Sequence, residues 1–434
     1  MTSRRDFLRT TSLAGIAAAA AAGRLHADPA DPTLPSPPSG PLEQVARDEA
    51  YWGRIAAQYR VPREPINLEG GYFGLMANPV LEAYHRNIDR ANGESSYFAR
   101  REYPAFERTA RQRVASFVGT SVDEVVLTRG ATEALQALIG QYQLLQRGDT
   151  VLYADLDYNA MQWAMNALAA RHGASVARLT IPEPASTSAI LAAYTAALDA
   201  HPRTKLLLVT HCNNKTGLIH PVRDIVALAK ARGADVIVDA AHSFGQIPLT
   251  MDELGADFVG LNLHKWVGAP IGAGAMYIRA GRLDAIGIAH GDEGPADRIT
   301  TRIHTGTTPF ATTMTIPDAL DFQLSIGIAA KAARLRYLRD RWVHAVRDLP
   351  GVTILTPEDP ALTGAITSFR LHGRGTREAN AALAATLLDE FGIFTFQRSG
   401  IAGGDCVRVT PALYNMPADL DRLADAIRTI AARP

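Results

Sequence analysis

The feature that most constrains this chain is a run of alternating strand-like and helix-like segments between residues 150 and 242. Apolar, β-branched stretches such as KLLLVT (205–210) and VIVD (236–239) alternate with segments whose apolar residues recur at helical spacing. Repeated strand-then-helix units predict an α/β fold with a mostly parallel sheet sandwiched between helices. Short strands and helices alternate again from Val352 to the end, which predicts a smaller α+β C-terminal domain.

Length and composition set the domain organisation and exclude some functions. The 434 residues are 47% hydrophobic and 20% charged with a formal net charge of zero, which suffices for two domains. We expect a linker and N-terminal helix at 28–65, a large domain at 66–315 and a small domain at 316–434. The balanced charge gives no basis for nucleic-acid binding. The two cysteines make neither a disulfide framework nor a zinc motif, so no metal is expected.

The first 27 residues resemble a twin-arginine (Tat) export signal. The segment SRRDFL (3–8) precedes a weakly apolar, alanine-rich run, and a small residue for cleavage follows at Ala27. The run is too short to cross a bilayer, which takes about 20 residues. The alternatives are a disordered basic N-terminus or an uncleaved anchor. We therefore expect recognition by the Tat export machinery, a periplasmic location and no permanent membrane anchor.

Polar side chains follow several of the expected strands at the point where each strand ends. Asp157 and Tyr158 follow one strand, HCNN (211–214) another and DAAH (239–242) a third, while Lys265 ends a further short apolar run. The carboxyl ends of parallel strands meet at one edge of a sheet, where open α/β folds bind ligands. An acid and a lysine at that edge can hold opposite ends of one cofactor.

A candidate phosphate site lies after the strand expected at 124–128. Gly130 and Thr132 precede a helix there, and the free N–H groups of a helix N-terminus attract anions. The alternative is that Thr132 only caps the helix. The glycines at 268–274 precede a strand and not a helix, so they do not form a dinucleotide-binding loop.

Four motifs carry a resemblance to a known family: DAAH (239–242), NLHKW (262–266), TGTTP (305–309) and VRVTP (407–411). With them the chain, from about residue 65 to its end, resembles the class V, fold-type I pyridoxal-phosphate (PLP) enzymes. These include cysteine desulfurases, kynureninase and especially isopenicillin N epimerase-like proteins, and among the last an exported enzyme of pyoverdine maturation. The resemblance implies a fold-type I structure, PLP as cofactor and a homodimer.

The resemblance implies three catalytic residues. Lys265 would form a Schiff base with the cofactor aldehyde and carry protons at the substrate Cα. Asp239 would pair with the pyridine nitrogen, and His242 would contact the ring hydroxyl or the Schiff base. The alternatives are a surface lysine and an acid that caps a helix.

The remaining implied site residues bind the cofactor or the substrate. Asn214 would contact the O3′ oxygen, with Asn213 as its near alternative, and Tyr158 would stack on the ring unless it only packs in the core. Ala131, Thr132 and Asn262 would bind the phosphate, together with Thr307 from the partner subunit. Arg408 would clamp the substrate α-carboxylate. Tyr72, in a glycine-rich turn, either shapes a hairpin or walls the substrate pocket.

The expected function is a PLP enzyme that acts on a small-molecule amine or on an amino-acid group of a peptide-type metabolite, in an aminotransferase-like reaction. Epimerisation and elimination by a C–S lyase are the alternatives within the same chemistry. Desulfurases need a mobile cysteine before Arg408, and residues 398–405 contain none. From other classes, a catalytically silent PLP-fold binding protein and a dinucleotide-dependent oxidoreductase remain to be distinguished.

Overall fold

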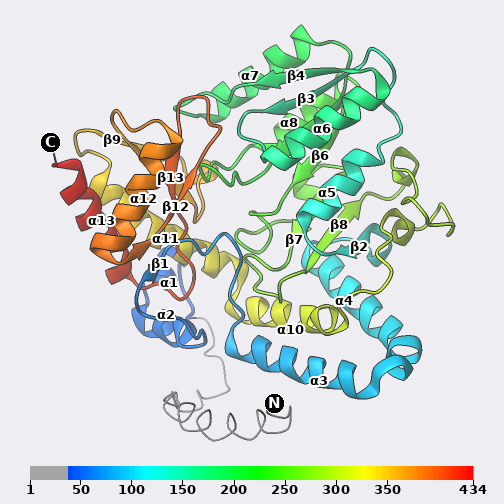
Figure 1. Cartoon of the computed structure of the whole chain (residues 1–434), viewed down its shortest axis with the longest axis horizontal. Helices are drawn as coiled ribbons and strands as arrows, with labels where there is room; N and C mark the ends of the chain where they lie inside the picture. Colours follow the sequence, from blue (N-terminus) through cyan, green and yellow to red (C-terminus); the bar gives the residue numbers. More distant parts are fainter. Residues whose placement is uncertain (1–37, 434) are drawn as a thin grey trace, which may run out of the picture. The chain divides into compact units, whose positions relative to one another are not determined.

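A seven-stranded sheet forms the centre of the larger part of the molecule (Figure 1). Strand β8 is antiparallel to both of its neighbours, and every other adjacent pair in the order β7-β6-β5-β3-β4 is parallel. The predicted mostly parallel sheet is therefore confirmed. In spatial order the strands are β2 (Val125–Thr128), β8 (Gly274–Ile278), β7 (Phe258–Asn262), β6 (Asp235–Asp239), β5 (Thr204–Thr210), β3 (Thr150–Ala154) and β4 (Ser175–Leu179).

The structure is a computed structural model and describes residues 38–433. The predicted export signal at 1–27 and the first part of the predicted linker, 28–37, lie outside the described residues. Within residues 38–433, no helix combines the length and the apolar character needed to cross a membrane.

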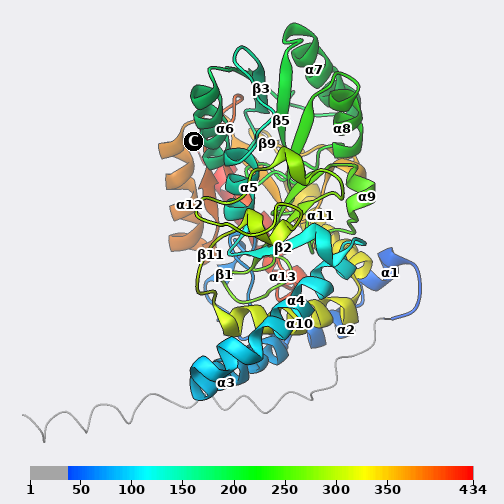
Figure 2. The same cartoon turned by 90° about the vertical axis from the view of Figure 1, so that its right-hand side faces the viewer.

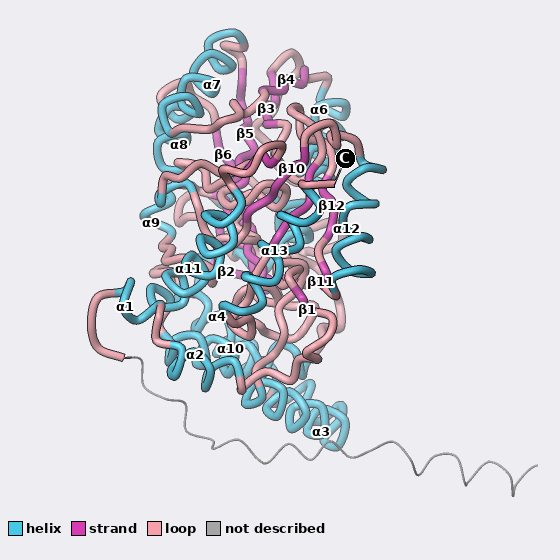
Figure 3. The backbone as a smooth tube through the Cα atoms, turned by 90° about the vertical axis from the view of Figure 1, so that its left-hand side faces the viewer, coloured by secondary structure: helices cyan, strands magenta, loops and turns pink. Residues whose placement is uncertain are grey.

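Burial on both faces explains why the central strands are continuous apolar runs. Every residue of β3, β6, β7 and β8 is buried. Helices cover one face and a second set of helices covers the other (Figures 2 and 3). The first set is α5 (Ala131–Gly140) and α6 (Asn159–His172), and the second is α7 (Thr187–Ala200), α8 (Val222–Lys230) and α9 (Met251–Leu254).

The C-terminal part is built on an antiparallel four-stranded sheet, as the α+β prediction required. Its order is β12-β13-β10-β9, and helices pack with it around a separate core that includes Trp342 and Phe369. The strands are β9 (Val352–Ile354), β10 (Thr367–Leu371), β12 (Phe396–Arg398) and β13 (Cys406–Val409), and the helices are α11 (Ile328–Val346), α12 (Arg377–Phe391) and α13 (Pro417–Ala431).

The remaining helices lie beside these two parts. They are α1 (Leu42–Ala46), α2 (Glu49–Ala56), α3 (Asn78–Arg101), α4 (Tyr103–Phe117) and α10 (Phe310–Ile326). Helix α10 packs along α3 and α4, whereas α11 packs against α1 and α13. The chain thus passes from one packing environment to the other at Gly327, which lies between α10 and α11, whereas the expected boundary at 315 falls inside α10. Residues 95–101 continue α3 beyond a kink at Ser95.

The N-terminal strand also differs from expectation. Residues 66 and 67 form β1 (Ile66–Asn67), which pairs in parallel with β11 (Ile393–Phe394) of the C-terminal part. Ile66 and Leu68 are buried in the same core as Trp342. The segment that we assigned to the start of the large domain therefore packs with the small one.

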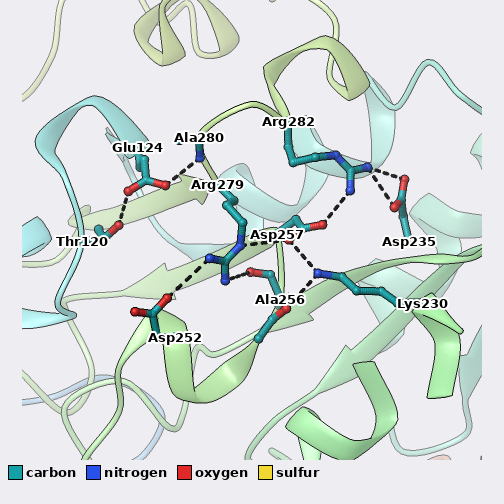
Figure 4. Close-up of polar contacts among 11 residues, drawn as sticks. Thr120, Glu124, Lys230, Asp235, Asp252, Ala256, Asp257, Arg279, Ala280 and Arg282 are labelled. Atoms are coloured by element: carbon teal, nitrogen blue, oxygen red, sulfur yellow. Dashed lines mark hydrogen bonds and ion pairs between the residues drawn. The ribbon is translucent and has the colours of Figure 1, made fainter. Parts of the chain in front are cut away.

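An ion-pair network closes the amino-terminal edge of the large sheet (Figure 4). The buried carboxylate of Asp257 accepts hydrogen bonds from Lys230 (2.8 Å), Arg279 (3.0 Å) and Arg282 (2.7 Å). Arg282 also pairs with Asp235 at 2.9 Å. Removal of a buried acid that several cations share is strongly destabilising, because the cations lose their compensating charge. The network fixes the end of the sheet that is opposite to the strand ends discussed next.

Candidate active site

A cavity of about 770 Å³ opens at the carboxyl ends of β5, β6 and β7. Each of these strands ends in a residue that lines it: Thr210, Asp239 and Asn262. The carboxyl ends of these parallel strands therefore meet at a cavity, as the sequence predicted. Of the predicted site residues, the cavity is lined by Tyr72, Ala131, Thr132, Tyr158, Asn214, Asp239, His242, Asn262, Lys265 and Arg408.

Thr307 is the predicted site residue that the cavity does not include. It lies in a smaller hollow of about 60 Å³ beside Thr128, Arg129 and Gly272. Arg129 lines both hollows, so Thr307 is near the edge of the site without being part of it within one chain. Its role as a residue donated by a partner subunit stays a prediction.

Lys265 is partly buried, and a histidine holds its amine. Its Nζ lies 2.9 Å from Nε2 of His242, and Nδ1 of that ring accepts a hydrogen bond from Trp266 Nε1 at 3.4 Å. Burial lowers the pKa of Lys265 to about 8, and burial together with the Lys265 charge lowers the pKa of His242 well below its usual value. A neutral imidazole that accepts at Nδ1 carries its proton on Nε2, directed at the lysine. Burial thus brings deprotonation of the amine close to physiological pH.

The acid at the other end of the site is Asp239. Burial raises the pKa of its carboxyl group, while the nearby Lys265 lowers it. Among the described residues, its carboxylate receives a hydrogen bond from the N–H of Ala241 (2.9 Å). Thr210 is fixed beside it, because its hydroxyl donates to buried Asp157 at 2.7 Å. A cationic ring nitrogen would add a countercharge beside this buried carboxylate.

The phosphate end is the N-terminus of α5, but its contacts differ in one respect from the prediction. The N–H of Ala131 donates to Oδ1 of Asn262 (2.7 Å), so in this structure it is not directed at a ligand. A Cβ added at Gly130 would lie 3.1 Å from both Asn262 Oδ1 and His264 Cε1. Asn262 therefore accepts from the first N–H of α5, and Thr132 and His264 line the cavity beside it.

Two observations test whether these residues fit PLP. The Oδ1 atom of Asn214 is buried and has no hydrogen-bond partner among the described residues, which is costly unless a ligand supplies one. The cavity also joins a helix N-terminus, an amine and a carboxylate, which match the phosphate, aldehyde and ring nitrogen of PLP. Tyr158 is 40% exposed beside them, as expected for a ring that is not packed in the core. The residues fit the cofactor.

Arg408 lines the cavity but is already paired. Its Nε and Nη2 atoms donate to Glu69, and Nη1 donates to the carbonyl of Asn214 at 2.7 Å. The sequence reasoning missed Glu69 and Arg398, which pairs with the same carboxylate and lines the same cavity. Glu69 lies two residues after β1 and Arg398 ends β12, so only the tertiary fold brings them together.

Neither cysteine lines the cavity. Cys212 and Cys406 are buried, and burial raises the pKa of each thiol to about 12. Cys406 lies in β13. A thiol of this kind is a poor nucleophile, because the thiolate is the reactive form.

Comparison with known proteins identifies the family. The model of aminotransferase class V matches residues 77–423. Isopenicillin N epimerase of Streptomyces clavuligerus is 30% identical over 399 residues, which cover 87% of this chain and 98% of that protein.

Solved structures share the fold. An apo cysteine desulfurase from Thermococcus onnurineus NA1 matches with a TM-score of 0.73 and 21% identity over 86% of this chain and 98% of that one. A C-DES mutant with glycine covalently linked to its PLP cofactor matches with a TM-score of 0.73 and 20% identity over 88% and 99%. The fold-type I architecture expected from the motifs is confirmed. The chain belongs to the class-V aminotransferase family of PLP-dependent enzymes.

Proposed function

We propose that this chain is an enzyme that moves a proton at the Cα of an amino-acid group and transfers its amino group, as an aminotransferase does. The observation that carries the proposal is the Lys265 amine in the cavity, which lies 2.9 Å from His242 and whose pKa burial lowers to about 8. An amine with a pKa near the working pH is suited both to bond an aldehyde and to carry protons.

Each residue around Lys265 would have its own role in the reaction. Bound PLP supplies an electron-withdrawing ring that stabilises negative charge at the substrate Cα. Asp239 holds a proton on the ring nitrogen, and Asn214 donates or accepts at the ring oxygen. Thr132, His264 and the α5 N-terminus hold the phosphate, and Tyr158 covers the ring. Lys265 accepts the Cα proton and returns it, while His242 orients its amine.

The substrate is proposed to be an amino-acid group of a peptide-type metabolite. Tyr72 and Ile271 line the cavity and are 68% and 65% exposed, so the mouth of the site is wide and partly apolar. An open mouth of this kind accommodates a group attached to a larger molecule. We further propose, from residues 1–27, export to the periplasm by the twin-arginine pathway, and a homodimer in which Thr307 completes the partner's site.

A second candidate is epimerisation at Cα. It is favoured by the 30% identity to isopenicillin N epimerase across almost all of that protein. The two reactions share the removal of the Cα proton and differ in its return. Epimerisation restores the proton at Cα with inversion, whereas transamination leaves a 2-oxo product.

Desulfuration is not favoured, since both thiols are buried outside the cavity. The variant Cys212→Ser/Cys406→Ser separates this alternative from the others. We expect that any sulfide released from cysteine by the wild-type enzyme is released equally by the double variant. Loss of sulfide release with an unchanged PLP spectrum would instead assign a catalytic thiol.

The function is tested by incubating purified holoenzyme with amino acids and amino-acid-bearing peptides in deuterated water, with a 2-oxo acid present. Transamination predicts a 2-oxo product and an aminated co-substrate, both found by mass spectrometry. Epimerisation predicts deuterium at Cα with inversion and no oxo product. A PLP spectrum that responds to no amine would support a catalytically silent binding protein and contradict the proposal.

A further inference from the structure

A second cavity of about 480 Å³ lies apart from the candidate active site. It opens between the start of α8, the segment that leads into α9, and α11, and it shares no lining residue with the first cavity. These three helices lie on one flank of the molecule (Figures 2 and 3). A cavity of this size can hold a small molecule, and the reaction proposed above uses none of its residues.

Two buried histidines line this second cavity. His211 is 9% exposed and His220 is 2% exposed. Nδ1 of His211 and both ring nitrogens of His220 are buried and make no hydrogen bond of normal geometry with any residue that the structure describes. Burial lowers the pKa of each imidazole to about 4, against the opposing effect of the Thr210 carbonyl on His220, so both rings are neutral. A buried polar nitrogen in this state indicates that a partner is missing.

The guanidinium of Arg336 reaches the same cavity from α11. Its Nε is buried without a hydrogen-bond partner in the described part of the chain, and its Nη2 donates to the carbonyl of Thr363 over a long distance, 3.4 Å. The other charged residues of the lining are exposed, namely Arg223, Asp224 and Glu253. Among residues 38–433, the half-buried Arg336 therefore has no paired carboxylate, and a charge in such a position is stabilised by a compensating one.

The remaining lining is mostly apolar and includes Ile219, Ile247, Leu249 and Leu254. Apolar surface of this kind gains stability when an apolar group covers it. Within residues 38–433 no three His, Cys, Asp or Glu side chains are arranged to hold a metal ion, so the two histidines are considered as hydrogen-bonding groups. The second cavity thus combines an apolar wall with one cation and two neutral rings that can donate or accept.

We propose that this second cavity binds a small organic acid with one carboxylate and an apolar body. The carboxylate would accept hydrogen bonds from Arg336, whose planar guanidinium fits both oxygens, and from His211. The body of the acid would lie against the apolar wall. A single negative charge matches the one unpaired cation. A dianion such as phosphate would bring its second charge close to Asp224 and Glu253, and these two acids would repel it.

The test follows para-fluorophenylacetate by fluorine NMR as it is titrated against holoenzyme. The matched uncharged probe is para-fluorophenylacetamide. Arg336→Gln should weaken binding of the acid by about tenfold or more and change binding of the amide little. Arg341→Gln is the matched control, because Arg341 lies on the same helix but pairs with Asp421 and does not line the cavity. Equal weakening of both probes by Arg336→Gln would contradict the assigned carboxylate contact.

A second variant separates this cavity from the first one, where Arg408 could also attract an acid. Ala332→Phe places a ring in the second cavity and should abolish the part of the binding that Arg336→Gln weakens. Its control is Ala329→Phe, because Ala329 is exposed on the same helix and does not line the cavity. Acid binding that stays at the wild-type level in both Ala332→Phe and Arg336→Gln would belong to another site and would overturn the inference.

Competition decides the class of ligand. Benzoate should displace the probe, and inorganic phosphate at the same concentration should not. Displacement by phosphate and not by benzoate would overturn the monocarboxylate assignment. If the acid shows no saturable binding to wild-type holoenzyme, water alone meets the buried nitrogens and the inference is wrong. Should Ala332→Phe not fold, Arg336→Gln still decides. These outcomes are independent of the reaction at Lys265, because neither probe carries an amine that could react there.

Discussion

The Nζ atom of Lys265 lies 2.9 Å from Nε2 of His242, so a hydrogen bond joins the amine to a neutral imidazole inside the site. Asp239 raises the pKa of this amine, and burial lowers it by more, to about 8. Asp239→Asn should therefore lower the pKa of Lys265 further, by about one unit or more. The measurement is the rate at which an acylating reagent labels Lys265 in apoenzyme as pH is varied, followed by peptide mass spectrometry. An unchanged midpoint would show that Asp239 does not act on the lysine.

Gly74 tests how tightly the lysine backbone is packed. Its N–H donates to the carbonyl of His264 at 2.8 Å, and an added Cβ would lie 1.8 Å from the carbonyl oxygen of Lys265. Gly74→Ala should displace the Lys265 peptide and sharply reduce PLP retention, measured by cofactor absorbance after gel filtration. Gly93→Ala is the matched control, because nothing lies within 4 Å of its added Cβ in α3. We expect it to retain PLP and to be as stable as the wild type or slightly more so. Equal retention by the two variants would refute the close packing.

The amino-terminal edge of the sheet should depend on one carboxylate. Asp257→Ala leaves Lys230, Arg279 and Arg282 without their shared partner and should lower the free energy of unfolding by about 3 kcal/mol. Asp252→Ala removes an acid from the same Arg279, but that side chain is 85% exposed, so stability should be nearly unchanged. Urea unfolding compares the two. Similar losses would mean that burial is not what makes Asp257 important.

Lys331 should make stability depend on pH. Its Nζ is buried and donates to the carbonyl of Trp266 and to Gln323 (2.7 Å). No acid in the described part of the chain pairs with it, and burial lowers its pKa to about 7. Between about pH 7 and pH 10 the unfolded chain binds this proton and the folded one does not, so stability should rise with pH.

The variant Lys331→Met removes that dependence, which amounts to at most about 1.4 kcal/mol per pH unit. Urea midpoints of wild type and variant should therefore diverge progressively across this range. Parallel pH profiles would show that Lys331 keeps an ordinary pKa in the folded protein.

The sequence sufficed for the large sheet and for most of its site, because both follow from local rules. Strands buried on two faces are continuous apolar runs, and the carboxyl ends of parallel strands converge. These rules brought Asp239, Lys265 and the segment that contains Asn214 to one edge of the sheet, where Asp239, Lys265 and Asn214 line the cavity. Recognition of the motifs then added Asn262 and Arg408, which also line the cavity.

What the sequence did not show are contacts between residues far apart in the chain. Glu69 meets Arg408 across 339 positions, and Asn262 meets the Ala131 amide across 131. No spacing rule connects such pairs, since they depend on how the C-terminal sheet packs beside the large one. The parallel pairing of β1 with β11 is hidden for the same reason, because a strand of two residues carries no periodicity.

The most direct test of the central claim is reduction of the holoenzyme with borohydride followed by peptide mass spectrometry. The structure predicts that the reduced cofactor is found on Lys265, and that Lys265→Ala, with the same overall fold by circular dichroism, shows neither the adduct nor turnover. A cofactor adduct on another lysine, or turnover by Lys265→Ala at the wild-type rate, would contradict the account.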